Sequence, residues 1–324
     1  MNAFADDAPG RACPLRYRYA PTAIARCAER TAATLYVVGG LYGNGAALHE
    51  VQRMAAAEPG PVTLCFNGDF HWFDVDATQF AGIEAVVATH DAIQGNVEAE
   101  LVAADDAAGC GCAYPDDVDA DVVERSNRIH ARLKATARCL PASLARLAAL
   151  PMLRRYRVGS LTVGVVHGDA ESLAGWRFGV ESLGRADALA WLASAFAAAQ
   201  VEVFASSHTC LPVLRQFALG DGTATVVNNG AAGMPNFRGR CRGLLTRIGP
   251  APSPHAPLYG VRAAGVHIDA LEIAYDEASW REAFLAQWQV GSPAHASYWH
   301  RITNGPAFAP ADATRAAHRA LLEA

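Results

Sequence analysis

Four side chains in this sequence combine residue types and positions that suit the binding of a metal ion. They are Asp69, Asn96, His167 and His208. Each follows a short apolar run, and polar residues at the carboxyl ends of buried strands lie where open α/β sheets bind their ligands. One carboxylate, one amide oxygen and two imidazoles form a ligand set for Mn, Fe, Zn or Ni. The four residues therefore predict a site for a divalent transition metal.

The clearest of these strand ends is the one that carries Asp69. Its apolar run covers residues 62–66 and breaks into Asn-Gly-Asp at 67–69. An aspartate after a glycine is by itself an ordinary turn. Four further apolar segments end in a polar or glycine-rich stretch in the same way. Three of them cover residues 35–40, 161–166 and 201–205, and the fourth ends at residue 93. We therefore expect several buried strands whose ends meet at one edge.

Helical patterns alternate with the first strands. We expect helices at 22–29, at 46–57 with Asn44 as the N-cap, at 76–88, at 116–150 with a break at Pro141, and at 184–200. Strand patterns then follow one another at 213–219, 224–228, 258–262 and 265–273, before closing helices at 277–289 and 311–324. Alternation followed by consecutive strands predicts a sheet sandwich flanked by helices.

Composition narrows the class of protein. The chain has 324 residues, 52% hydrophobic residues and a net charge of -5, so it is long and apolar enough to bury a large core. The charge gives no reason to expect a nucleic-acid partner, and no apolar run approaches the ~20 residues of a membrane span. Residues 1–19 begin with acids and lack the apolar stretch of a secretory signal. We expect a cytoplasmic location.

In order and spacing, the strand ends resemble the calcineurin-like metallophosphoesterase superfamily, whose blocks are D-x-H, G-D-x-x-D, G-N-H-[DE], H-G and G-H-T-H. The blocks here read GLYGN at 40–44, GDFHW at 68–72, GNVE at 95–98, HG at 167–168 and SHTC at 207–210, with NNGA at 228–231 in place of N-P-G-S. The resemblance runs from about residue 35 to 273. It implies an α/β fold, a four-layer α/β/β/α sandwich.

The resemblance also implies a site for two metal ions, of which this sequence keeps one half. The retained ligands are Asp69, Asn96, His167 and His208. In the other half, Gly40, Tyr42 and Cys210 stand where the family has an aspartate and two histidines, and Val97 replaces the histidine of G-N-H. The chain is thus a divergent relative with a degenerate half-site, and we expect about one bound ion.

Two questions about the site stay open at this stage. A second ion could be held by substitute ligands, which would be Tyr42, Cys210, His71, Asp74 or Asp169. Catalysis would depend on Asp69 and on His71, which either donates a proton, supports the ligands from behind or contacts the substrate. A metal-free hydrolase using His71 and Asp74 is a weaker alternative.

The sequence predicts a metal-dependent hydrolase of a phosphate mono- or diester, acting on a small phosphorylated substrate. The alternative is an inactive protein of the same fold that senses phosphate or a nucleotide, or serves as an interaction module. Arg238 and Arg240 would either hold a phosphate or lie solvated at the surface. We expect a lead-in at 1–30, a metallophosphoesterase-like domain at 31–275 with a helical insertion at about 105–155, and a C-terminal helical segment at 276–324 packed on that domain.

Overall fold

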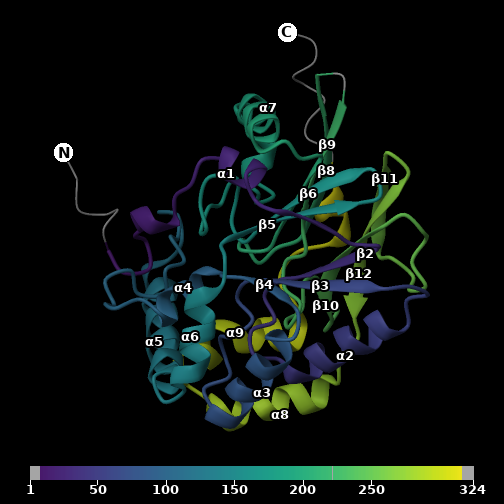
Figure 1. The fold of residues 1–324 in the computed structure, drawn as a ribbon. Coiled ribbons are helices and arrows are strands. Elements are labelled where there is room, and N and C mark those ends of the chain that lie inside the picture. Colours follow the sequence, from purple (N-terminus) through teal and green to yellow (C-terminus); the bar gives the residue numbers. More distant parts are fainter. Residues whose placement is uncertain (1–7, 221, 316–324) are drawn as a thin grey trace, which may run out of the picture.

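The computed structural model describes residues 8–220 and 222–315, in which two six-stranded sheets carry helices on their outer faces (Figure 1). One sheet has the order β1 (Glu29–Thr31), β5 (Leu153–Val158), β6 (Leu161–Val166), β7 (Val203–Ser206), β9 (Gly222–Asn228) and β8 (Val213–Leu219). The other has the order β11 (Tyr259–Ala263), β12 (Val266–Ile273), β10 (Gly243–Gly249), β2 (Thr34–Val38), β3 (Val62–Asn67) and β4 (Asp91–Ile93).

The helices divide between the outer faces and the ends of this sandwich. They are α1 (Thr22–Ala25), α2 (Gly45–Ala56), α3 (Ala77–Val87), α4 (Asn96–Leu101), α5 (Ala120–Ala137), α6 (Pro141–Ala149), α7 (Ala188–Ala199), α8 (Glu277–Gln287), α9 (Pro293–Asn304) and α10 (Pro310–Thr314). The predicted break at Pro141 is confirmed, because this proline is the first residue of α6. In the described part of the helix predicted at 311–324, the structure has only the short helix α10 (Pro310–Thr314). Residues 316–324 lie outside the described part of the chain.

Buried apolar side chains fill the space between the sheets and the space under the helices. Val37 of β2 packs in one cluster with Val163 of β6 and Val203 of β7. On the outer faces, Tyr36 lies in the cluster beneath α2, α3 and α8, and Phe204 lies in the cluster beneath α1 and α7. Strands covered on both faces read as continuous apolar runs. The predicted four-layer α/β/β/α sandwich is therefore confirmed.

Parallel strands in each sheet bring distant parts of the chain to one edge. β2, β3 and β4 run parallel in one sheet, and β6, β7 and β9 run parallel in the other. Their carboxyl ends therefore point the same way within each sheet, which is the usual position of a binding site in α/β folds. Within the described residues, no helix is both long and apolar enough to cross a membrane.

Five helices and strands do not appear among the predicted ones. They are β1, α4, β5, β10 and α9. β10 was missed although it is buried along its whole length, because Thr246 and Arg247 interrupt its apolar pattern. Arg247 is fully buried and donates to Glu58 through Nε and Nη2 and to Asp269 through Nη1. Paired in this way, a charged side chain is tolerated inside the sandwich.

The predicted N-cap of α2 is confirmed and leads to a stability prediction. Asn44 is buried; its Oδ1 accepts from the Ala47 backbone N–H at 3.0 Å and its Nδ2 donates to the Gly233 carbonyl at 2.9 Å. Asn44→Ala should lower the free energy of unfolding by about 2–4 kcal/mol, because it removes a cap and leaves a buried carbonyl unpaired. Urea unfolding measures this loss. Asp276→Ala, which removes only the exposed cap of α8, should cost about 1 kcal/mol, and equal losses would contradict the role of the Gly233 contact.

Candidate metal centre

The four candidate ligands come from four strand ends and meet in one place. Asp69 follows β3, Asn96 begins α4 after β4, His167 follows β6, and His208 follows β7. The Nε2 atom of His167 lies 3.0 Å from Asn96 Oδ1, 3.2 Å from His208 Nδ1 and 3.4 Å from Asp69 Oδ1. All four side chains are buried. The structure therefore brings together the residues that the sequence predicts as one ligand set.

Backbone carbonyls determine which nitrogen of each imidazole carries a hydrogen. Nδ1 of His167 lies 2.9 Å from the carbonyl of Asn67, and Nε2 of His208 lies 3.1 Å from the carbonyl of Cys112. A carbonyl only accepts, so the ring nitrogen that faces it carries a hydrogen. When each ring is neutral, as a metal ligand must be, the opposite nitrogens, Nε2 of His167 and Nδ1 of His208, present lone pairs towards each other. This is the arrangement by which neighbouring groups orient histidine metal ligands.

The amide and the carboxylate complete the set with oxygen lone pairs. Asn96 donates from Nδ2 to the Cys110 carbonyl at 2.9 Å, which turns its Oδ1 towards His167. Asp69 Oδ1 accepts from the backbone N–H of Val97 at 3.2 Å. Ligands about 2.0–2.2 Å from a common ion lie about 3.0–3.5 Å apart, which matches the spacings around His167. The donor set therefore fits a divalent metal ion.

Burial and mutual charge shift the acidities in this centre. Burial would raise the pKa of Asp69, but His167 outweighs it and holds that pKa below its usual value. Burial would lower the pKa of His167, and the Asp69 carboxylate outweighs burial and raises it. For His208, burial and the neighbouring His167 lower the pKa to about 3. Asp69 is therefore ionised and His208 is neutral at pH 7, as metal ligands must be.

Glu98 holds the turn that carries Asp69, and the sequence reasoning gave it no role. Its carboxylate accepts from the backbone N–H groups of Asp69 at 2.8 Å, Phe70 at 3.1 Å and Gly95 at 2.8 Å. Asp69 has a φ of 53°, in the left-handed region that non-glycine residues seldom adopt. A buried carboxylate bonded to successive N–H groups stabilises that backbone.

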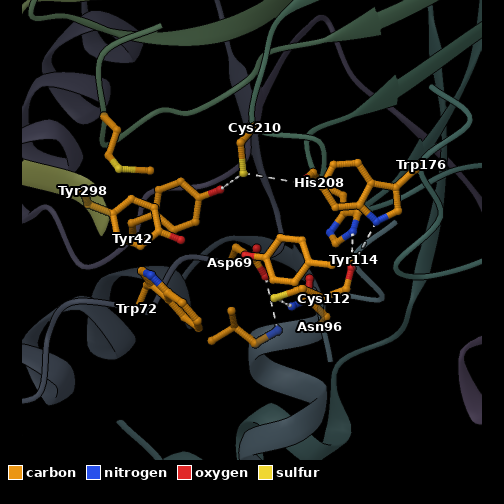
Figure 2. Close-up of a pocket in the computed structure, with 12 residues that line it drawn as sticks. Tyr42, Asp69, Trp72, Asn96, Cys112, Tyr114, Trp176, His208, Cys210 and Tyr298 are labelled. Atoms are coloured by element: carbon orange, nitrogen blue, oxygen red, sulfur yellow. Dashed lines mark hydrogen bonds between the residues drawn. The ribbon is translucent and has the colours of Figure 1, made fainter. Parts of the chain in front are cut away.

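The centre lies at the floor of a pocket of about 390 Å³, counting its mouth. Figure 2 shows the side chains around it. Five of them are aromatic: Tyr42, Trp72, Tyr114, Trp176 and Tyr298. From the sequence alone, no pocket role was expected for Trp72, Tyr114, Trp176 and Tyr298. These residues lie on loops or on α9, and a single sequence does not show which cavity such side chains face. The pocket is thus an aromatic cleft above one carboxylate and two imidazoles.

Comparison with known proteins identifies the fold. No family model and no curated protein matches the sequence. A metallophosphoesterase structure from Sphaerobacter thermophilus is similar, with a TM-score of 0.54 and 16% identity, covering 85% of this chain and 100% of that one. The hypothetical protein PH1004 from Pyrococcus horikoshii OT3 has a TM-score of 0.55 and 13% identity, covering 85% and 99%.

The chain has the metallophosphoesterase fold. At the level of the fold, this confirms the resemblance to the calcineurin-like superfamily.

The half of the metallophosphoesterase site that lacks the family's ligands is filled with side chains. The ring of Tyr42 lies against Gly40, where an added Cβ would be 2.8 Å from it. The Tyr42 hydroxyl lies 2.9 Å from Cys210 Sγ. Burial and the nearby Cys210 raise the pKa of Tyr42 well above its usual value, and burial raises the pKa of Cys210. Both groups are therefore protonated and bonded to each other, and either would have to lose its proton before it could bind a metal ion.

His71 is not brought to the pocket. It is fully buried, with Nδ1 2.5 Å from Asp74 Oδ2 and Nε2 3.2 Å from Glu84 Oε2, and its ring stacks on Phe80 with centroids 3.7 Å apart. Burial would lower the pKa of His71, but Asp74 outweighs it and raises the pKa to about 9. Both ring nitrogens are occupied by carboxylates, so this geometry suits a buried ionic network and not proton transfer to a substrate.

The remaining candidates have other partners. Asp169 accepts from the backbone N–H groups of Glu171, Ser172 and Arg177, and so holds its own loop. Arg240 pairs with Glu272 at 3.2 Å, and Arg238 is exposed. Neither arginine lines the pocket.

The His71 network leads to a second stability prediction. His71→Ala should lower the free energy of unfolding by about 3–5 kcal/mol, because the carboxylates of Asp74 and Glu84 lose the cation between them. Metal content per folded molecule should stay unchanged. Chemical unfolding and metal analysis of the folded fraction measure the two effects. His90→Ala, at an exposed position, should change stability by less than about 0.5 kcal/mol. Loss of metal with unchanged stability would instead assign His71 to the centre.

Proposed function

We propose that this protein hydrolyses a phosphate ester with one divalent transition metal ion, held by Asp69, Asn96, His167 and His208. The observation that carries the proposal is the orientation of these four side chains. Asn96, His167 and His208 donate outward to backbone carbonyls, and Asp69 Oδ1 accepts from the Val97 backbone N–H, while the ligand atoms of the other three lie 3.0–3.4 Å from Nε2 of His167. Lone pairs at such distances repel one another unless a proton or a cation lies between them, and a divalent ion relieves that repulsion.

Each residue has a distinct part in the proposed centre. Asp69 supplies the only negative charge of the four ligands and therefore most of the attraction for the ion. Asn96, His167 and His208 bind through neutral atoms and determine where the ion lies. When bound, a divalent ion supplies positive charge that polarises the phosphoryl group and activates water for attack. The pocket above the centre is lined by Asp69, Asn96 and His208, so a small phosphorylated substrate bound there would contact the ligand set.

One ion is proposed because the second half-site has no space and no anionic ligand. Gly40 contributes no side chain, and Tyr42 and Cys210 bond to each other as neutral groups. The cytoplasmic location expected from the sequence is kept as part of the proposal.

An inactive sensor of phosphate or a nucleotide is the second candidate. The observation that favours it is the side chain of Val97, which lines the pocket at the edge of the centre and cannot transfer a proton. A bound phosphate would then be held and not cleaved.

The first prediction of the proposal concerns metal content. Protein purified with manganese or zinc supplied should hold about one equivalent of ion. Asp69→Asn and His208→Ala should each remove it and abolish hydrolysis of nitrophenyl phosphates, because the first removes the only negative charge among the four ligands and the second removes one ligand. Elemental analysis and an absorbance assay measure both.

Matched variants separate this centre from its alternatives. Tyr42→Phe and Cys210→Ser should retain about one equivalent, and His90→Ala should behave as the wild type. Two stoichiometric ions in the wild type, falling to one in Tyr42→Phe, would show that the second half-site is rebuilt. One bound ion without turnover of any aryl phosphate would favour the sensor.

Glu98 should act on the centre through Asp69. Glu98→Gln keeps the size of the side chain but replaces one acceptor oxygen with an NH₂ group that faces backbone N–H donors. The turn of Asp69 should loosen, and metal affinity should fall about 10–100-fold. Competition with a chelating dye measures this affinity. Glu100→Gln alters the next acidic residue of α4, which contacts Tyr17 and Arg16 instead. It should leave the affinity unchanged, and an equal fall in both variants would indicate general damage to α4.

A further inference from the structure

The pocket above the centre has an unusual balance of charge. Among the described residues that line it, Asp69 is the one with a charged side chain at pH 7, and no lysine or arginine is present. One divalent ion bound beside one carboxylate leaves the centre with a single net positive charge. A phosphate monoester carries about two negative charges near neutral pH, since its second pKa is about 6, whereas a diester carries one.

Charges behind the lining do not change this balance. The guanidinium of Arg301 donates to the carbonyls of Cys210 at 2.7 Å and Pro235 at 3.0 Å, so it is engaged outside the pocket. The carboxylate of Glu98 lies on the other side, bonded to the backbone of Asp69. Each group is bonded to backbone, and neither lines the pocket. A second negative charge on a bound ester would therefore have no cation of its own.

The aromatic side chains of the pocket form two walls. Figure 2 shows Trp72 and Tyr298 on one side of Asp69, and Tyr114 and Trp176 on the other. The rings of Tyr114 and Trp176 are 5.9 Å apart between centroids. Aromatic walls bind apolar or aromatic groups by burying their surface. A diester has two organic groups, one for each wall, whereas a monoester has one.

We propose that this centre selects singly charged phosphodiesters with compact apolar or aromatic groups over doubly charged monoesters, an inference that rests on the proposed function. In the reaction, the oxygen of water forms a bond to phosphorus and the bond from phosphorus to the leaving oxygen breaks. One proton of the water passes to the leaving oxygen and the other stays on the monoester product. That product carries a second charge at neutral pH, and the pocket releases it readily.

Three substrates with the same leaving group separate charge from aromatic contact. They are p-nitrophenyl phosphate, p-nitrophenyl methylphosphonate and p-nitrophenyl phenylphosphonate, assayed with manganese-loaded protein at about pH 8, where the first carries two charges. The methylphosphonate should exceed the phosphate in kcat/KM by at least about tenfold, because one unpaired charge is removed. The phenylphosphonate should gain about a further tenfold from the second wall.

A binding measurement tests the same selection without turnover. Diphenylphosphinate has one negative charge, two phenyl groups and no ester bond, and phenylphosphonate has two charges and one phenyl group. Calorimetric titration of the manganese-loaded protein should give a Kd at least about tenfold lower for diphenylphosphinate. Equal or tighter binding of phenylphosphonate, with faster cleavage of the monoester, would overturn the inference and leave the hydrolase proposal intact. Tighter binding of diphenylphosphinate without cleavage of any ester would support the charge selection and refute the hydrolase.

A single added cation should reverse the selection. Tyr298→Arg places a positive charge on one wall, and Tyr298→Gln removes the ring without adding charge. The ratio of diphenylphosphinate to phenylphosphonate affinity should fall at least about tenfold in Tyr298→Arg relative to Tyr298→Gln. The role of charge would be overturned if the ratio of the two affinities were the same in both variants. The contribution of the aromatic wall is given by the affinity for diphenylphosphinate of Tyr298→Gln relative to that of the wild type.

Discussion

The ring of His167 joins the two sheets at the point where their strands end. Its Nδ1 faces the carbonyl of Asn67 at the end of β3, in the opposite sheet, while Nε2 faces Asn96 and His208. The four candidate ligands therefore stay together only while the two sheets keep their relative position. Val37, Val163 and Val203 pack between the sheets, so the apolar core that stabilises the fold also determines the distances between ligands. Core packing at native density leaves little room for those distances to vary.

The local backbone at the centre is strained and is held by its surroundings. Asp69, Tyr42 and Cys210 all have φ between 53° and 59° without being glycine, and such conformations cost of order 1–3 kcal/mol each. Glu98 fixes the turn at Asp69, and the bond between the Tyr42 hydroxyl and Cys210 links the other two. The intact half of the site and the filled half thus share one kind of backbone geometry, although only the first retains ligands.

Sequence reasoning reached the fold, and it named four residues that the structure brings together, because both depend on local patterns. Asp69 and His167 each follow a strand buried on both faces, whose continuous apolar run is readable without a structure. Partners that are distant in sequence were not readable in this way. Nothing near Arg247 indicates that Glu58 will neutralise it inside the sandwich, so β10 was missed. Nothing near His71 indicates that Glu84 and Phe80 will enclose it, so its side chain was expected at the pocket.

The filled half-site and the aromatic pocket are physically connected. A bridging carboxylate between two divalent ions leaves three net positive charges, enough to pair with a doubly charged ester. With the ring of Tyr42 against Gly40, one ion and one carboxylate leave one positive charge, and Coulombic attraction for a substrate falls accordingly. In the proposed single-ion centre, binding would then depend more on apolar contact, which contributes about 25 cal/mol for each Å² removed from water. The rings of Trp72, Tyr114 and Trp176 would supply that contact in a pocket whose described lining has no lysine or arginine, so the proposed single ion and the aromatic lining are consistent with each other.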